Sequence, residues 1–150
     1  MREILFRGKR TDNGTWAYGY LFCIWERTYL CWGTTNDVPN MKEVIPETVG
    51  QYTGLTDKNG VKIFEGDILR GFEYPFRSNS DGEFNYFVEI VWFDDSSAFG
   101  IYTFKNPKSN VRGISEGNTD YLEYFNVDKW EVIGNIHDNL ELLEGGMEND

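Results

Sequence analysis

The sequence predicts a mainly β (α+β) fold: bent antiparallel sheets with small-barrel-like character, and one or two short helices near the C-terminus. Apolar residues recur at every second position in several segments, which is typical of strands. Clusters of Asn, Asp and Gly separate these segments and favour tight turns. Aromatic residues make up 17% of the 150 residues. A chain this rich in aromatics can bury a core, so the composition excludes a wholly disordered protein.

The first predicted element is a hairpin over residues 2–25. Residues 2–7 supply one strand, Thr11-Asp12-Asn13-Gly14 supplies the turn, and residues 16–25 alternate with period two along the second strand. Both faces of the second strand carry apolar side chains. We therefore expect this strand to be central in its sheet or to lie at an interface.

The chain then turns at Glu26-Arg27 into a strand over residues 29–32. Reflection about that turn places Cys23 nearly opposite Cys31. We expect both thiols to be reduced and to serve as small apolar core residues. The polar segment 34–43 is predicted to be a loop.

The middle of the chain predicts a strand over 49–53, a turn over 56–60 and a further strand over 61–64. Gly66 allows a sharp bend before the strand resumes at residue 68. At such a bend Asp67 can accept hydrogen bonds from neighbouring N–H groups. Gly-Asp bends of this kind open strands in small SH3-like barrels.

Residues 84–93 form the strongest predicted strand, and a turn over 94–97 leads into another strand over 99–104. The polar segments on either side, 71–83 and 105–119, are predicted to be loops. The second of these is the best candidate for a mobile insertion.

The C-terminal part predicts a short helix over 120–126, a strand over 129–133 and a helical turn that begins at Asp138. At this length the chain fits a single domain, so we expect residues 1–150 to form one domain. Residues 145–150 are expected to form an acidic flexible tail.

Acidic residues outnumber basic ones by 25 to 14, which gives a net charge of −11 with the single His neutral. Non-specific nucleic-acid binding requires basic side chains that neutralise phosphates. The charge therefore argues against nucleic acid as a partner, unless the few cations cluster. A small cluster does occur near the N-terminus, followed by aromatics that could stack on bases. The candidate binding residues are accordingly Arg7, Lys9, Arg10, Trp16 and Tyr18.

No segment approaches the roughly 20 apolar residues of a membrane span, and the apolar run at the start is too short for a signal peptide. We therefore expect a cytoplasmic protein that makes no membrane contact. No cofactor and no metal site are expected. The segment Asp57-Lys58-Asn59-Gly60 lacks the ligand spacing of a calcium loop, so we interpret it as a turn. Asp94-Asp95 is likewise interpreted as a solvated hairpin turn.

His137 is the only histidine and so the default general base near neutral pH. It stands between a predicted strand and a predicted helical turn. The candidate catalytic residues are His137, Asp138 and Asp67. The structural alternative is a histidine that hydrogen-bonds to the turn backbone, and none of the common catalytic motifs accompanies it.

Four segments together resemble the YopX family, small proteins encoded by phages and prophages of bacteria. They are Phe6-Arg7-Gly8-Lys9-Arg10 through Trp16-x-Tyr18-Gly19, Pro46 through Asp57, Ile63 through Ile68, and Val132 through Asn139. The family usually has proline after the last segment, where this chain has Leu140. The resemblance implies a phage-derived, cytoplasmic, largely β protein, and it implies no activity.

Three functional hypotheses remain open. The first is a non-enzymatic module that binds a host or phage protein or assembles with itself as a homo-oligomer. The second is a small hydrolase or nucleic-acid-processing enzyme that uses His137 and nearby carboxylates. The third is nucleic-acid contact through the basic N-terminal segment. The first is favoured, because two-sided apolar strands need a second cover, which a partner surface can supply.

Overall fold

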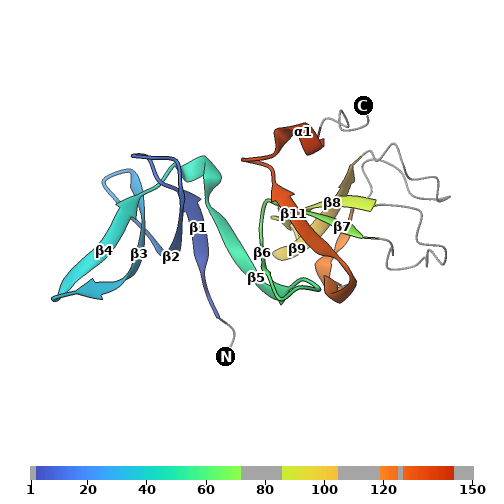
Figure 1. Cartoon of the computed structure of the whole chain (residues 1–150), viewed down its shortest axis with the longest axis horizontal. Coiled ribbons are helices and arrows are strands. Elements are labelled where there is room, and N and C mark those ends of the chain that lie inside the picture. Colours follow the sequence, from blue (N-terminus) through green and yellow to red (C-terminus); the bar gives the residue numbers. More distant parts are fainter. Residues whose placement is uncertain (1–2, 72–85, 105–118, 125–126, 144–150) are drawn as a thin grey trace. The chain divides into compact units, whose positions relative to one another are not determined.

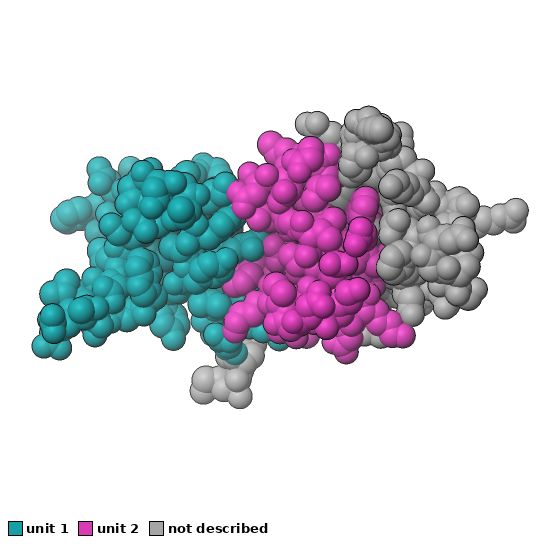
Figure 2. Space-filling view, in the orientation of Figure 1, with its two compact units in different colours: residues 1–54 teal, residues 55–150 magenta. Residues whose placement is uncertain are grey.

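A computed structural model of the protein shows two compact units, residues 1–54 and residues 55–150 (Figure 2). The structure describes residues 3–71, 86–104, 119–124 and 127–143. The expectation of one domain over 1–150 stays a prediction, and the expected tail at 145–150 lies outside the described residues.

The strands belong to two antiparallel sheets (Figure 1). The six-stranded sheet has the order β4-β3-β2-β1-β5-β6, and the five-stranded sheet has the order β10-β9-β8-β7-β11. The strands are β1 (Phe6–Lys9), β2 (Trp16–Ile24), β3 (Arg27–Thr35), β4 (Val38–Glu43), β5 (Gly50–Thr56), β6 (Lys62–Phe64), β7 (Asp67–Gly71), β8 (Tyr86–Phe93), β9 (Ala98–Phe104), β10 (Thr119–Tyr121) and β11 (Glu131–Asn135). Three 3₁₀ turns, η1 (Pro46–Thr48), η2 (Leu122–Tyr124) and η3 (Val127–Lys129), and one helix, α1 (Leu140–Leu143), complete the described elements. The predicted mainly β fold is confirmed.

The first hairpin joins β1 and β2 as predicted, with Lys9 opposite Trp16. Its first strand begins at Phe6, later than the predicted residue 2. Gly14 has a φ of 73°, and its N–H donates to the carbonyl of Arg10, so the turn needs a residue that tolerates positive φ. Strand β2 lies between β1 and β3, which confirms the prediction of a central strand.

The predicted pairing of the two cysteines is wrong. Cys23 pairs with Thr28, and Cys31 pairs with Tyr20, because the hairpin turn consists of Trp25 and Glu26 alone. Cys23 is exposed and Cys31 is half-buried, so neither is a core residue.

The predicted loop over 34–43 is also wrong. Strand β3 continues to Thr35, a turn at Asn36 and Asp37 follows, and β4 begins at Val38. Both turn residues have positive φ, which suits a two-residue hairpin. The segment is polar because β4 is the edge strand of an exposed hairpin, where Pro39 is also tolerated.

The first unit curls toward a small barrel, although neither sheet closes into a barrel in the described residues. An isolated bridge between Arg10 and Val44 brings the chain after β4 back beside the chain after β1. The Thr11 N–H donates to the carbonyl of Glu43 at 3.0 Å, and the Ile45 N–H donates to the carbonyl of Lys9 at 2.8 Å. Inside this curve, a small core forms from Ala17, Leu30 and Val44, with Phe6, Leu21 and Val49 packed against it.

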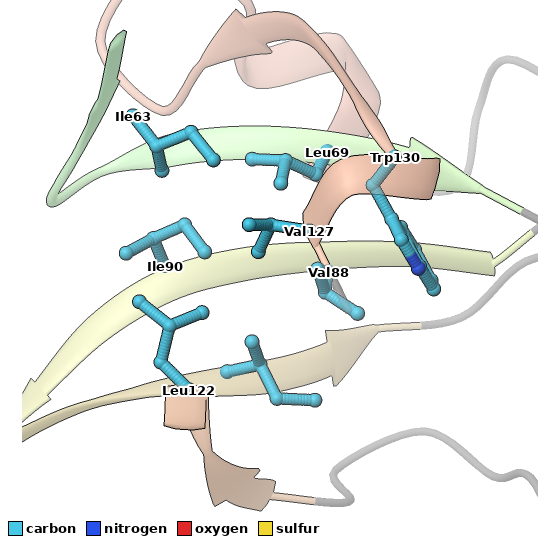
Figure 3. Packing of buried hydrophobic residues seen from close by; sticks show 8 residues of the cluster. Ile63, Leu69, Val88, Ile90, Leu122, Val127 and Trp130 are labelled. Carbon is cyan, nitrogen blue, oxygen red and sulfur yellow. The ribbon is translucent and has the colours of Figure 1, made fainter. Parts of the chain in front are cut away.

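The second unit has the larger core (Figure 3). Its buried members are Ile63, Leu69, Val88, Ile90, Ile101, Leu122, Val127 and Trp130. A Cβ atom added to Gly71 would lie only 2.3 Å from the Trp130 ring. Glycine at the end of β7 therefore leaves the room that the indole occupies.

The bend at Gly66 and Asp67 behaves as predicted. Gly66 has a φ of 93°, and the Phe64 N–H donates to Oδ2 of Asp67 at 2.7 Å. The bend is further fixed by the Gly66 N–H, which donates to the carbonyl of Ile90 at 2.8 Å. Asp67 is 1% exposed, so its side chain belongs to the interior.

The predicted helix over 120–126 is replaced by the end of β10 and the turn η2, and residues 125–126 lie outside the described residues. Of the predicted insertion at 105–119, residues 105–118 lie outside the described residues, and Thr119 begins β10. Of the predicted loop at 71–83, residues 72–83 lie outside them, and Gly71 ends β7. The last predicted strand is present as β11, and the helical turn is present as α1. Among the described residues, no helix has the length and apolar character that crossing a membrane requires.

Candidate functional site

One face of the β1–β2–β3 sheet gathers aromatic and basic side chains. Residues directly opposite each other on antiparallel strands point to the same side, and so do alternate residues of one strand. Arg7 pairs with Tyr18 and Lys9 pairs with Trp16. This aromatic face consists of Arg7, Lys9, Trp16, Tyr18, Tyr20, Phe22, Tyr29 and Cys31. The opposite side of the same strands forms the core of the first unit.

The middle of the aromatic face is open to solvent. Tyr18 is 46% exposed and Tyr20 is 67% exposed, although both lie on a central strand. Farther along β2, Phe22 stacks on Tyr29 with 5.3 Å between ring centroids and 15° between ring planes. The face therefore presents flat aromatic surface rather than a hydrophilic outer layer.

The basic residues at the start of this face are held against an aromatic ring. The Arg7 guanidinium lies 4.7 Å from the centroid of the Trp16 ring, and the Lys9 ammonium lies 5.6 Å from it. Both distances fit cation–π contacts. Arg7 is only 7% exposed, so its charge is largely withdrawn from solvent.

Arg10 lies beyond β1 and faces a carboxylate instead. Its Nε and one terminal nitrogen donate to the two oxygens of Asp12 at 3.0 and 2.8 Å, and the Lys42 ammonium lies 3.6 Å from the same carboxylate. The hydrogen bond with Arg10 lowers the pKa of Asp12, and the same bond raises the pKa of Arg10. Four predicted binding residues thus share the aromatic face, whereas Arg10 forms a surface ion pair.

The net negative charge resides in the second unit. Residues 1–54 contain six Lys and Arg against six Asp and Glu, whereas residues 55–150 contain eight against nineteen. The unit that carries the aromatic face is therefore neutral overall.

The loop that carries His137 is organised by Asn135. Its Oδ1 accepts the N–H groups of His137 and Asp138, both at 2.9 Å, and its Nδ2 donates to Oδ2 of Asp138 at 3.1 Å. The side chain of Asn139 closes the loop, because its Oδ1 accepts the Asn135 N–H at 3.1 Å. Sequence reasoning named the histidine but missed the two asparagines that shape its loop.

The predicted catalytic residues come from segments that meet in the second unit. Asp67 pairs with Asn135 between β7 and β11, and the Ile136 N–H donates to the carbonyl of Gly66 at 2.9 Å. The carboxylates of Asp67 and Asp138 both accept hydrogen bonds that shape the backbone. A catalytic role for His137, Asp138 and Asp67 stays a prediction.

Asp57 sits in the turn that was compared with a calcium loop. It is 5% exposed and accepts the N–H groups of Asn59 and Val61, which confirms the interpretation as a turn. Within the part of the chain that the structure describes, no three His, Cys, Asp or Glu side chains gather as a metal site would require.

A shallow cavity of about 280 Å³ lies beside the turn between β8 and β9. It is lined by Phe93, Asp95, Ser96, Thr119, Asp120 and Tyr121. The hydroxyls of Ser96 and Tyr121 hydrogen-bond to each other at 3.0 Å. The Ser96 hydroxyl also donates to Oδ1 of Asp95 at 3.2 Å. None of the predicted catalytic residues His137, Asp138 and Asp67 lines this cavity, so it does not support the enzyme hypothesis built on them.

The pKa of the Glu89 carboxyl is raised above its ordinary value. Burial is the larger cause and the charge of Glu65 is the smaller one. Glu89 lies opposite Ile68 and Tyr102 in the sheet. Its environment disfavours the ionised form, and no described contact links it to the predicted catalytic residues.

Comparisons with known proteins give a family and similar solved structures. A family model described as YopX protein matches residues 5–144. A crystal structure of the protein EF1440 from Enterococcus faecalis is similar, with 22% sequence identity and a TM-score of 0.48, over 95% of this chain and 99% of that chain. No curated protein matches the chain.

Proposed function

The chain belongs to the YopX family, and from this premise we propose that it is a non-enzymatic module that binds another protein, or a second copy of itself, through its aromatic face. We further propose that it is encoded by a phage or prophage and acts in the cytoplasm of a bacterial host. The origin and the compartment rest on the family resemblance of the four sequence segments.

The observation that carries this proposal is the exposure of Tyr18 and Tyr20 on a central strand. Large aromatic side chains that cluster on a surface are typical of protein interaction sites. The core of the first unit lies on the other side of β2, so the exposed rings are not needed to complete that core. A partner protein would give these rings the cover that the described part of the chain leaves open.

The contacts of the candidate catalytic residues favour structural roles. Asp67 fixes the bend before β7, and Asp138 accepts a hydrogen bond from the asparagine that organises its own loop. A general acid or base must reach a substrate atom. A carboxylate that is 1% exposed, as Asp67 is, has little means of doing so.

The contacts of the basic residues disfavour nucleic acid. Arg7 is buried beside Trp16, and Arg10 is paired with Asp12. To bind phosphate, Arg7 would have to leave Trp16 and Arg10 would have to leave Asp12. The net charge of −11 on the whole chain also opposes phosphate binding.

The test is capture of partners by the tagged full chain from a lysate of the bacterium that carries the gene, with and without nuclease. Light scattering on the purified chain gives its mass in solution. The proposal expects a stoichiometric protein partner that survives nuclease, or a mass that is a multiple of 17.5 kDa. A partner that is lost with nuclease would overturn it in favour of nucleic acid. A monomer that captures nothing would overturn it as well.

A further inference from the structure

The cavity beside the turn between β8 and β9 is formed by two segments that are distant in the sequence. Part of its lining comes from the end of β8 and the turn, and the rest is β10. The lining residues are Phe93, Asp95, Ser96, Thr119, Asp120 and Tyr121. Strand β9 holds the two segments together, because it pairs with both β8 and β10. The cavity is therefore built on the five-stranded sheet of the second unit.

Two aromatic rings form the apolar part of the cavity. A Cβ atom added to Gly100 would lie 2.1 Å from the Phe93 ring, so this glycine of β9 leaves the room that the ring occupies. The rings of Phe93 and Tyr121 meet edge to face, with 5.8 Å between their centroids and 79° between their planes. The face of such a ring carries partial negative charge and attracts cations.

The hydroxyl hydrogens of Ser96 and Tyr121 are used within the cavity. Ser96 donates to Oδ1 of Asp95 at 3.2 Å, and its hydroxyl lies 3.0 Å from the Tyr121 hydroxyl. Because Ser96 has only one hydroxyl hydrogen, Tyr121 is the donor of the second bond. A ligand in the cavity would therefore meet oxygen acceptors rather than these two donors.

Two carboxylates supply these acceptors. The Tyr121 N–H donates to Oδ1 of Asp120 at 2.8 Å, and Oδ1 of Asp95 accepts the Ser96 hydroxyl. Oδ2 of neither carboxylate has a hydrogen-bond or ion-pair partner among the described residues. No Lys, Arg or His is among the described residues that line the cavity.

The charge around the cavity is negative within its own unit. Residues 55–150 contain eight Lys and Arg against nineteen Asp and Glu. The ring of Tyr124 lies 6.2 Å from that of Tyr121, and the charge of Glu123 is the main cause that raises the pKa of Tyr124. The charge of Asp120 raises the same pKa further. This part of the surface therefore disfavours an added negative charge.

We propose that the cavity binds a cationic group at the end of an alkyl chain, a guanidinium or an ammonium, as carried by arginine and lysine side chains and by free polyamines. Its volume of about 280 Å³ suits such a group alone, because pockets for whole drug-sized ligands span roughly 300–1,000 Å³. The N–H groups of the cation would donate to Oδ2 of Asp95 and Asp120, and the aromatic rings would face the charge. The inference goes beyond the proposed function, since the cavity lies in the second unit and the aromatic face in the first.

The test is an NMR titration of the full chain with three small probes. A capped arginine tripeptide is compared with its citrulline counterpart, in which a neutral urea group replaces the guanidinium. Spermidine represents the free polyamines. The backbone N–H signals of Ser96 and Tyr121 report binding at the cavity, and the concentration dependence of their shifts gives the dissociation constant.

Two variants remove the charges that the proposal requires. Asp95→Asn and Asp120→Asn each keep an oxygen for the hydrogen bond that the carboxylate accepts within the protein. Asp94→Asn is the matched control, because Asp94 is exposed in the same turn and does not line the cavity. All three variants change the net charge by the same amount.

We expect the arginine tripeptide to shift the signals of Ser96 and Tyr121 and to bind Asp95→Asn and Asp120→Asn about fivefold more weakly than wild type. Asp94→Asn should match wild type, and the citrulline tripeptide should bind more weakly than the arginine tripeptide. Tighter binding of spermidine, with the same loss in both cavity variants, would identify a free polyamine as the source of the cation, and tighter binding of the tripeptide would identify a protein side chain.

Three results would overturn the inference. The first is equal binding of the citrulline and arginine tripeptides, which would show that charge is not recognised. The second is an equal loss in Asp94→Asn and the cavity variants, which would show attraction by net charge alone. The third is the absence of any shift at Ser96 and Tyr121 with either cationic probe. None of these results bears on partner capture through the aromatic face, so the proposed function is tested separately.

Discussion

The carboxylate of Asp57 accepts the backbone N–H of Val132 at 2.9 Å, across 75 residues of sequence. The Val132 N–H donates to Oδ2. Oδ1 of the same carboxylate accepts the N–H groups of Asn59 and Val61 at 2.8 and 2.9 Å. A single buried side chain thus shapes the turn before β6 and satisfies an N–H group on β11, the edge strand of the five-stranded sheet.

Replacing Asp57 should therefore destabilise the second unit strongly. Asp57→Ala leaves three N–H groups without their acceptor, and we expect the free energy of unfolding to fall by about 3 kcal/mol. Asp57→Asn keeps an oxygen for the turn but turns an NH₂ group toward Val132, so its loss should be smaller. Urea unfolding measures both. Asp12→Ala, an exposed control, should change stability far less than Asp57→Ala does. An equal loss in the two variants would contradict this account.

The loop around His137 should show coupling between Gly134 and Asn139. A Cβ added to Gly134 would lie 2.4 Å from Oδ1 of Asn139, the atom that accepts the Asn135 N–H. We expect Gly134→Ala to lower the free energy of unfolding by about 2 kcal/mol. Asn139→Ala removes the obstructing oxygen. In a chain that already carries Asn139→Ala, we expect Gly134→Ala to lower the free energy of unfolding by much less. Strictly additive losses in a double-mutant cycle would contradict the contact.

Glu89 should make stability depend on pH. Burial and Glu65 raise the pKa of Glu89 in the folded chain above its unfolded value. The ionised Glu89 carboxylate therefore destabilises the folded state at neutral pH. This destabilisation disappears as the pH falls through the pKa of the folded chain to the pKa of the unfolded chain. We expect Glu89→Gln to raise the urea midpoint at pH 7 and to match wild type near pH 4. A lower midpoint for Glu89→Gln at pH 7 would show that the ionised carboxylate is stabilising.

Replacing Trp25 in the turn between β2 and β3 should stabilise the protein. Trp25→Asn replaces a residue strained at a φ of 51° with one that tolerates positive φ. We expect the free energy of unfolding to rise by about 1 kcal/mol, measured by urea denaturation. Val38→Asn, which leaves both turns unchanged, should not be stabilised. A destabilised Trp25→Asn would mean that the indole supports the fold.

The alternation of side chains predicted the central strand. The basic cluster and the aromatics that follow it together supplied four residues that the structure places on the aromatic face. Arg7 and Lys9 could be placed beside Trp16 and Tyr18 because the Asn13-Gly14 turn fixes the register of the first hairpin. These signals come from residues close together in the sequence. The conformation of a tight turn depends on its own residues, so it can be predicted from the sequence.

The second hairpin was predicted, but its register could not be, for the same reason. Trp25 and Glu26 carry no turn signal, so the pairing of Cys23 with Cys31 was placed wrongly. Strand β4 was missed because an exposed edge strand has no apolar face to show period two. The roles of Asp57 and Asn135 depend on partners outside their own turns or on loop geometry, which a single sequence does not reveal.

The central claim is that the aromatic face binds a protein, and it is tested by one comparison. Tagged wild type, a Tyr18→Ser/Tyr20→Ser variant and a Tyr102→Ser control are used to capture partners from nuclease-treated host lysate. Tyr102 is a matched control because it is 37% exposed on β9 in the other unit. We predict that wild type and Tyr102→Ser retain the same stoichiometric partner and that the double variant, still folded by circular dichroism, loses it. Retention of the partner by the double variant would contradict the account.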